Sequence, residues 1–309
     1  MCSILASGKL ILEAIMSYIL SCCSTVDLTK EHLERLNVSY TCFHYTLDGV
    51  EYADDLGQSI SFDDFYSRLK NGSDSKTSQI SVGEYEDYFK SLLDTGKDVI
   101  HISLSTGVSG SYRSACTAAD MLREQYPNQK LYVIDSLAAS SGYGLLVDEA
   151  AKKRDEGLSI DALNAWVEDN KLNLHHWFFS SDLTFFVKGG RVSKVSGMIG
   201  GVFEICPILN VSNEGRLIPR AKIRTKKRVI PELVKLMAEH ANGGKDYSGK
   251  VYISNSDCKE DAQAVADLIK ADFKNIDGDI LINSIGTVIG SHSGPGTVAL
   301  FFWGDKRVD

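Results

Sequence analysis

The sequence predicts an α/β protein in two parts: a parallel-sheet N-terminal domain and an α+β C-terminal domain with a mainly antiparallel sheet. Three observations lead to this fold class. The chain is 309 residues long, which favours two domains over one. Strand-like and helical patterns alternate from residue 16, as is typical of a parallel sheet. After residue 160, strand-like runs include a pair joined by a short turn, which is typical of antiparallel hairpins.

In the N-terminal part, apolar or alternating runs predict strands, and a helical pattern follows each of them. The predicted strands cover residues 17–23, 41–49, 76–81, 98–104 and 130–136. Ser81 and Glu84 form the signature of a capping box, so a helix is expected to begin directly after them.

The C-terminal part opens with a helix over residues 157–171, and a second helix is expected over 260–273. Strands are predicted at 175–182, 205–224, 250–257 and 297–304, with a turn at Asn213-Glu214-Gly215. The expected division is an N-terminal extension over 1–15, a first domain over 16–160 and a second over 161–309.

Composition excludes several classes of function. A net charge of −8 argues against a nucleic-acid partner. The seven cysteines are odd in number and scattered, so we expect neither a disulfide framework nor a zinc site, and a reducing cytoplasm fits best. Lys9 and Glu13 interrupt the apolar N-terminal stretch, which therefore predicts neither a secretion signal nor a membrane span.

Three polar clusters stand at strand ends or helix starts, where α/β sheets place ligand groups. They are Thr77-Ser78-Gln79, Thr106–Ser111 and Gly290–Gly296. Each cluster taken alone fits turn and capping duty, but their joint occurrence indicates a site. Hydroxyls and backbone N–H groups at a helix N-terminus can hold an anion.

Catalytic motifs are incomplete. Gly107–Ser111 resembles a nucleophile elbow with its second glycine one place too early, and no Walker loop occurs. The histidines His175, His176 and His292 lack partners at metal-ligand spacing, so no metal is expected. A hydrolase or phosphotransferase that uses Ser109 or His292 on a small acid or sugar remains the alternative function.

Two basic segments stand out in this acidic chain. Residues 220–228 carry six cations, and residues 188–193 place Lys188 and Arg191 around a glycine pair. The first segment is expected to be a strand with a solvated charged face, and the second an exposed loop. Both could alternatively dock an acidic partner or a phosphate.

Read together, these motifs resemble the DegV family of bacterial fatty-acid-binding proteins, which present acyl chains to fatty acid kinase. The likeness extends from about Ser24 to Trp303. The family motifs appear in order at Cys23–Leu28, Asp48–Tyr52, Thr77–Ser81, Ser105–Ser111, Val133–Ser136, Phe186–Ser193, Cys206–Leu209 and Gly290–Gly296.

The resemblance implies a cytoplasmic, non-enzymatic carrier without a cofactor, whose ligand is a long-chain fatty acid and whose partner is the catalytic subunit of a fatty acid kinase. The fatty acid would be taken up by transient contact with a membrane. The implied head-group residues are Thr77, Ser78, Ser109, Gly110 and His292. Candidates for the acyl tunnel, each equally well explained as ordinary core, are Phe178, Phe185, Ile199, Val202, Phe203 and Ile205. Candidates for partner docking are Lys188, Arg191, Lys226 and Lys227.

The sequence departs from the family pattern at four positions. Cys23 replaces an aspartate, Ile80 a proline, and Ser111 and Ser291 each replace a threonine. The two serines keep a hydroxyl, so the site is expected to persist. The loss of a carboxylate at Cys23 leaves open which orienting contact that carboxylate makes.

Overall fold

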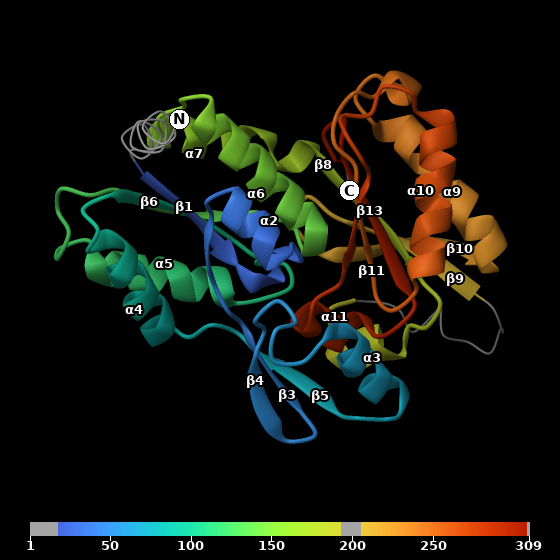
Figure 1. Cartoon of the computed structure of the whole chain (residues 1–309), viewed down its shortest axis with the longest axis horizontal. Helices are drawn as coiled ribbons and strands as arrows, with labels where there is room; N and C mark the ends of the chain where they lie inside the picture. The colour runs from blue at the N-terminus through green and yellow to red at the C-terminus, as the bar shows by residue number, and fades with distance from the viewer. Residues whose placement is uncertain (1–17, 193–204, 308–309) are drawn as a thin grey trace, which may run out of the picture.

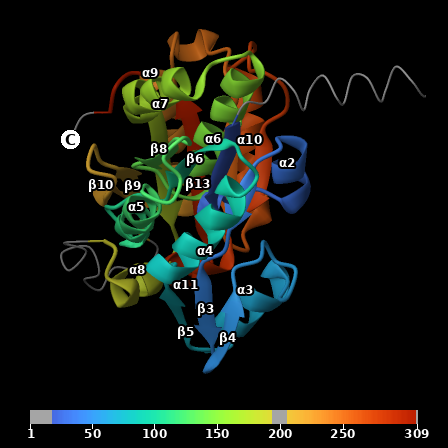
Figure 2. The ribbon, with the colours of Figure 1, turned by 90° about the vertical axis from the view of Figure 1, so that its left-hand side faces the viewer.

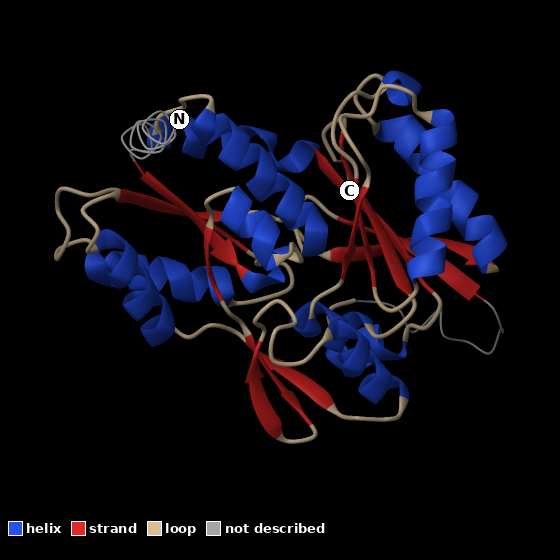
Figure 3. Ribbon diagram, in the orientation of Figure 1, coloured by secondary structure: helices blue, strands red, loops and turns tan. Residues whose placement is uncertain are grey.

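The computed structural model describes residues 18–192 and 205–307, which form a mixed α/β structure with three sheets (Figures 1 and 3). A parallel sheet lies in the N-terminal part and a mostly antiparallel sheet in the C-terminal part, so the predicted fold class is confirmed. The predicted extension over 1–15 lies outside the described residues.

The N-terminal sheet has four parallel strands in the order β2-β1-β6-β7. Its strands are β1 (Tyr18–Cys23), β2 (Ser39–Thr41), β6 (Asp98–Ser103) and β7 (Leu131–Asp135). Helices cover both faces (Figure 1). They are α2 (Lys30–Arg35), α4 (Val82–Leu93), α5 (Ser111–Leu122), α6 (Ser140–Asp155) and α7 (Ile160–Asn170). The capping box of Ser81 and Glu84 at the start of α4 is confirmed.

Two strands that the sequence assigned to the parallel sheet lie elsewhere. The predicted strand over 41–49 holds the last residue of β2, all of β3 and the turn after β3. β3 and the residues around 76 belong to a separate antiparallel sheet with the order β4-β3-β5. Its strands are β3 (His44–Leu47), β4 (Val50–Ala53) and β5 (Ser75–Ser78), with α3 (Phe62–Lys70) between β4 and β5 in the chain. A tight Asp48-Gly49 turn, with both residues at positive φ, joins β3 to β4 and fixes this pairing.

The C-terminal sheet has six strands in the order β10-β9-β8-β13-β11-β12, and only β11 and β12 pair in parallel. Its strands are β8 (Leu174–Ser180), β9 (Ile205–Val211), β10 (Leu217–Arg224), β11 (Tyr252–Asn255), β12 (Leu281–Ser284) and β13 (Thr297–Trp303). The helices of this part are α8 (Thr184–Gly189), α9 (Lys226–His240), α10 (Lys259–Asp272) and α11 (Thr287–Ser293). Short 3₁₀ turns lie at Ser24–Val26, Lys171–Asn173 and Gly244–Asp246.

The two faces of this sheet belong to different apolar cores, because side chains alternate along a strand. Phe178 of β8 and Phe301 of β13 join the core shared with the N-terminal part. Phe179 and Phe302, one position further along, join a second core under α9 and α10. The inner face of β8 and β13 therefore looks toward the N-terminal part, and the outer face toward α9.

The predicted strand over residues 220–228 is wrong in its second half. Residues 220–224 alternate in exposure along β10, as expected, but Lys226 begins α9. The domain boundary at residue 160 stays a prediction, although α7 packs against β6 and β7 of the first sheet. In the described part of the chain, no helix has the length and apolar character needed to cross a bilayer.

Candidate functional site

A cavity of about 400 Å³ lies between the inner face of the six-stranded sheet and the N-terminal part. Its volume is within the range of roughly 300–1,000 Å³ that is usual for small-molecule sites. Most of its wall is apolar, and the residues that make up this part are Phe43, Leu104, Val108, Ala139, Phe178, Phe186, Val211, Leu217, Ile285, Val288, Ile289, Ala299 and Phe301.

Polar side chains in the wall come from segments that are far apart in sequence. All five predicted head-group residues, which are Thr77, Ser78, Ser109, Gly110 and His292, line the cavity. The Thr77 hydroxyl lies 2.7 Å from Nε2 of His292, across a separation of 215 residues in the chain. The structure thus brings the three polar clusters of the sequence to one cavity.

His292 lies near the end of α11 and is neutral at neutral pH. Burial, and secondarily the positive charge of Arg191, lower its pKa to about 4. Its Nδ1 atom is buried and has no hydrogen-bond partner among the described residues. In a catalytic triad a carboxylate orients the second nitrogen of the histidine, and among residues 18–192 and 205–307 no carboxylate bonds Nδ1 of His292.

The segment around the glycine pair is exposed, as the sequence predicted, but it begins as a helix: Gly189 is the last residue of α8 and half-buried, and Gly190 follows it and is exposed. Gly190 ends α8 in the left-handed region at φ 66°. A side chain at Gly189 would come within 2.5 Å of Nδ1 of His292, so only glycine allows this approach. Figure 2 shows α8 and α11 beside the small sheet of β3 and β5.

The turn before α5 is anchored at both ends, which fixes the position of Ser109. Ser105 is fully buried and donates to the carbonyl of Gly215, 2.9 Å away. Thr106 donates through its hydroxyl to Asp135 at 2.5 Å. The Ser109 hydroxyl accepts a bond from the backbone N–H of Ser111 at 3.2 Å. The predicted strand–turn–helix junction is thus confirmed, with β6 before it and α5 after it.

Two buried aspartates hold the start of α11 and so position His292. Asp27 accepts a bond from the backbone N–H of Gly286 at 2.9 Å. Asp54 accepts from the Thr287 hydroxyl at 2.6 Å. Burial raises the pKa of both carboxyl groups. Both aspartates belong to the N-terminal part, whereas α11 belongs to the C-terminal part, so these bonds also join the two parts beside the cavity.

The positions that depart from the family pattern keep structural contacts. Ser291 bonds Ser75 of β5 at 2.6 Å between hydroxyl oxygens, and Ser111 bonds Tyr85 at 2.8 Å. Cys23 is fully buried, and its Sγ lies 3.3 Å from the Tyr85 hydroxyl. Burial raises the pKa of the Cys23 thiol, which is therefore protonated at neutral pH. Cys23 thus supports Ser111 through Tyr85 and does not line the cavity.

Of the predicted acyl-tunnel residues, Phe178 lines the cavity and stacks on Phe186 with ring centroids 6.0 Å apart. Phe185 and Ile205 do not line it; Phe185 packs against Gly294 instead. Ile199, Val202 and Phe203 lie outside the described residues. The apolar residues of β13 and α11 in the wall were missed, because their patterns equally fit ordinary core.

The predicted docking cations fall into different environments. Arg191 lines the cavity yet stays exposed to solvent, and its partial burial lowers its pKa. Lys188 is exposed and bonds Asp74 at 2.5 Å. Lys226 bonds Asp261 at 2.6 Å, and Lys227 is exposed next to it. The polar wall residues that the head-group prediction omitted are Gln79, Ser140, His176, Arg191, Ser293 and Thr297. Of these, Gln79, Arg191 and Ser293 lie in segments that the sequence singled out.

The profile described as "Uncharacterised protein, DegV family" matches residues 23–305. A DegV domain-containing protein of Clostridium perfringens is 34% identical to this chain over 284 residues, which is 92% of this chain and 96% of that protein. A DegV domain-containing protein of Streptococcus pyogenes is 33% identical over 94% of this chain and 99% of its own length.

Solved structures of fatty-acid-binding proteins are also similar to this chain. A fatty-acid-binding DegV family protein from Thermus thermophilus is 26% identical and superimposes with a TM-score of 0.83, covering 94% of this chain and all of that one. A stearic-acid-binding protein from Eubacterium ventriosum is also 26% identical, with a TM-score of 0.82 over 92% of this chain and 97% of that one. Sequence and fold therefore lead to one conclusion: the chain belongs to the DegV family.

Proposed function

We propose that this protein binds one long-chain fatty acid in the cavity and presents its carboxylate to a separate fatty acid kinase, which forms the acyl phosphate. The observation that carries this proposal is the composition of the cavity wall, which is apolar over most of its area and has hydroxyls and a neutral imidazole grouped at Thr77, Ser109 and His292. The fatty acids bound by the structural relatives support it.

The apolar wall would supply most of the affinity. Burial of a methylene contributes about 0.8 kcal/mol, so a chain of about fourteen methylenes gains roughly 11 kcal/mol before the cost of ordering it. The wall residues Phe178, Phe186 and Ile289 offer the surface for this contact.

The polar groups would orient the ligand without neutralising it. The Thr77 and Ser109 hydroxyls can each donate to a carboxylate, and hydrogen bonds to charged acceptors are strong. His292 is neutral, so it forms no ion pair; its Nε2–H can donate to the Thr77 hydroxyl and leave the proton of that hydroxyl for the carboxylate. A carboxylate held in this way keeps its negative charge and its nucleophilic oxygen, which a kinase needs for phosphoryl transfer.

Arg191 lies in the wall of the cavity that holds these groups, and it is the residue best situated to contact the phosphate of the product. Lys188 and Lys227 are exposed and would attract an acidic face of the kinase. The chain has no Walker loop of its own, which is consistent with an external source of the phosphoryl group.

Two measurements test this proposal. An organic extract of the purified protein, analysed by mass spectrometry, should contain about one fatty acid per chain. The loaded protein, mixed with ATP and the fatty acid kinase of the same organism, should then yield acyl phosphate. A loaded protein that no kinase phosphorylates would contradict presentation but leave binding intact, whereas an empty protein that hydrolyses esters would favour an enzyme.

A further inference from the structure

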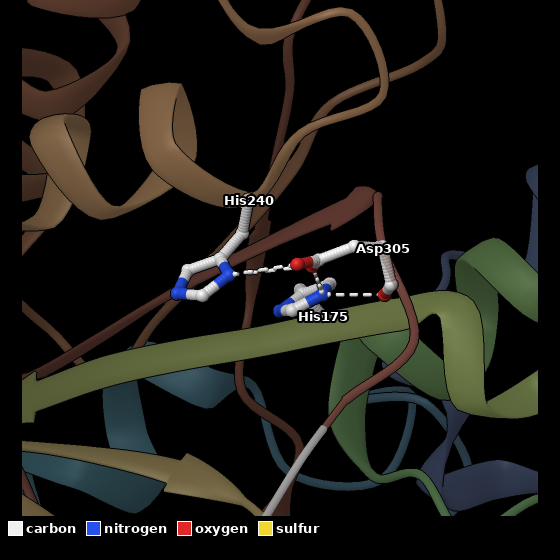
Figure 4. Close-up of side chains that lie close together, drawn as sticks. All are labelled: His175, His240 and Asp305. Carbon is white, nitrogen blue, oxygen red and sulfur yellow. Dashed lines mark hydrogen bonds and ion pairs between the residues drawn. The ribbon is translucent and has the colours of Figure 1, made fainter.

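A second cluster of functional groups lies on the outer face of the six-stranded sheet, away from the cavity. It consists of His175 of β8, His240 at the end of α9 and Asp305 just after β13 (Figure 4). One ligand atom from each residue lies within 4.8 Å of the other two. The side chain of the next residue, His176, lines the cavity, so the cluster and the cavity are on opposite faces of β8.

The carboxylate of Asp305 lies between the two imidazoles. Its Oδ1 is 2.9 Å from Nε2 of His175 and 3.2 Å from Nδ1 of His240. In a tetrahedral zinc site with metal–ligand bonds of about 2.1 Å, neighbouring ligand atoms are about 3.4 Å apart. An ion could thus take the place of the protons in the hydrogen bonds between Asp305 and the two imidazoles, with small movements of the side chains.

Packing holds both rings in place. His175 stacks on His240 with ring centroids 5.0 Å apart, and Trp177 also stacks on His240, with ring centroids 5.5 Å apart. Gly304 allows the end of β13 to lie close to the end of α9, because a side chain there would collide with the backbone carbonyl of His240 and meet Cδ2 of His175 at 2.9 Å. Ligands that are already ordered lose little conformational entropy when an ion binds.

The hydrogen bonds of His175 define what an ion at this site would replace. The indole N–H of Trp177 donates to Nδ1 of His175 over 3.3 Å. Nε2 of His175 lies 2.8 Å from the backbone carbonyl oxygen of Asp305, to which it donates. Coordination through Nε2 moves the ring proton to Nδ1 and gives up both bonds. The nearby charge of Arg307 opposes a cation, and the carboxylate of Asp305 compensates for it.

We propose that His175, His240 and Asp305 bind one divalent transition-metal ion of the zinc class, with water completing the coordination. Two imidazoles and one carboxylate are typical ligands for such an ion, whereas magnesium and calcium prefer oxygen ligands. This proposal replaces the expectation of no metal site. No local motif indicates this site, because neighbouring members of the cluster are 65 positions apart in the sequence.

The ion would tie β8, the end of α9 and the segment after β13 together. Asp305 is 61% exposed and His240 28% exposed, so an ion can enter from solvent. Because the cluster faces away from the cavity, the ion stabilises the sheet and leaves lipid binding unchanged. This separates its test from that of the fatty-acid function.

Isothermal titration of tag-free, full-length protein with ZnCl₂ in a non-chelating buffer tests the site. We expect one equivalent of zinc to bind and the melting temperature to rise with zinc. Asp305→Asn, which keeps the shape of the side chain, and His240→Ala should each weaken zinc binding by at least about tenfold. His44→Ala, which removes a histidine paired with Glu84 outside the cluster, should leave it unchanged.

Cobalt chloride provides a second readout, because Co²⁺ bound to nitrogen and oxygen ligands in a tetrahedral site gives intense visible absorption. This absorption should appear in the wild-type protein and be lost in Asp305→Asn, with circular dichroism unchanged. Absence of zinc binding by the wild-type protein would overturn the proposal. Equal zinc binding by the wild type and by both cluster variants would overturn it too, and would assign the zinc to cysteines or surface groups.

Discussion

The polar and apolar parts of the cavity wall are built in different ways. The polar groups stand on short elements that buried hydrogen bonds hold in place: α11 by Asp27 and Asp54, and the turn before α5 by Asp135. The apolar part stands on the long central strands β8 and β13, whose register is continuous over seven residue pairs.

This difference separates two tasks. A polar contact depends on direction, so each donor needs a backbone that is fixed in position. An apolar contact depends on area, so a sheet face with suitable side chains is enough. We therefore expect changes in the apolar wall to alter affinity strongly, and changes in the polar groups to alter orientation and reactivity.

Filling the cavity should have the largest effect. Ala299 lies in the wall on β13, and Ala299→Phe would displace several methylenes of the ligand. The loss of about four methylene contacts costs about 3 kcal/mol, or roughly a 150-fold rise in the Kd of a long-chain fatty acid. Fluorescence displacement titration measures this change.

Ala53→Phe makes the same replacement at an exposed position of β4 and serves as the matched control. Its Kd should stay at the wild-type value. If Ala299→Phe, with an unchanged melting temperature, also binds like the wild type, then the lipid does not occupy this cavity.

Removal of one head-group hydroxyl should have a moderate effect. Thr77→Val and Ser109→Ala each delete one donor to the carboxylate, at a cost of about 2 kcal/mol, or roughly 30-fold in Kd. The loss should be much smaller for the corresponding fatty alcohol, which carries no charge. Thr46→Val, on the neighbouring strand β3 and outside the cavity wall, is the control and should bind both ligands normally.

The pH dependence of binding should be small. The pKa of His292 is lowered to about 4, so this residue stays neutral from pH 6.5 to pH 8 and the affinity should change by less than about twofold. A charged imidazolium partner would behave differently, because affinity would fall as the pH rises through its pKa. A steep fall over this range, absent in His292→Gln, would assign an ion pair to His292.

Charge reversal at Lys188 and Lys227 should leave the Kd of the fatty acid unchanged. Both residues are exposed and neither lines the cavity. The double variant Lys188→Glu, Lys227→Glu should slow acyl-phosphate formation, and the wild-type rate should fall as salt increases. If the double variant forms acyl phosphate at the wild-type rate, then Lys188 and Lys227 do not dock the kinase.

Arg191 offers a contrast to these lysines, because it lies in the cavity wall. Arg191→Gln should impair phosphorylation even at high salt, where steering by surface charge is screened. If the phosphorylation rates of Arg191→Gln and of the lysine double variant depend on salt to the same extent, then Arg191 acts as a docking residue instead.

Sequence patterns correctly predicted the elements that depend on contacts between residues close together in the sequence. The capping box of Ser81 and Glu84 and the turn from Ser105 to Ser111 involve neighbours in sequence, and both are confirmed. The separate sheet of β3, β4 and β5 was not predicted, because a short strand carries no mark of its partner. Lys226 was assigned to a strand because the basic run hides the change from strand to helix periodicity.

The polar groups of the site were found through their motifs, whereas their contacts were not. Nothing near Thr77 indicates that it meets His292, which is 215 residues away. The roles of Asp27 and Asp54 were missed for the same reason, since each acts by holding α11 from another part of the chain. The apolar wall was predicted in part only, because cavity lining and ordinary core have the same composition.

The crystal structure of the chain with its bound fatty acid tests the proposed function most directly. We expect one acyl chain along the wall formed by Phe178, Ala299 and Phe301, with its carboxylate within 3.2 Å of the Thr77 and Ser109 hydroxyls, about the limit for a hydrogen bond. A reversed chain, with its methyl end at Thr77, or a lipid bound outside the cavity would contradict the proposal that this protein presents a carboxylate for phosphorylation.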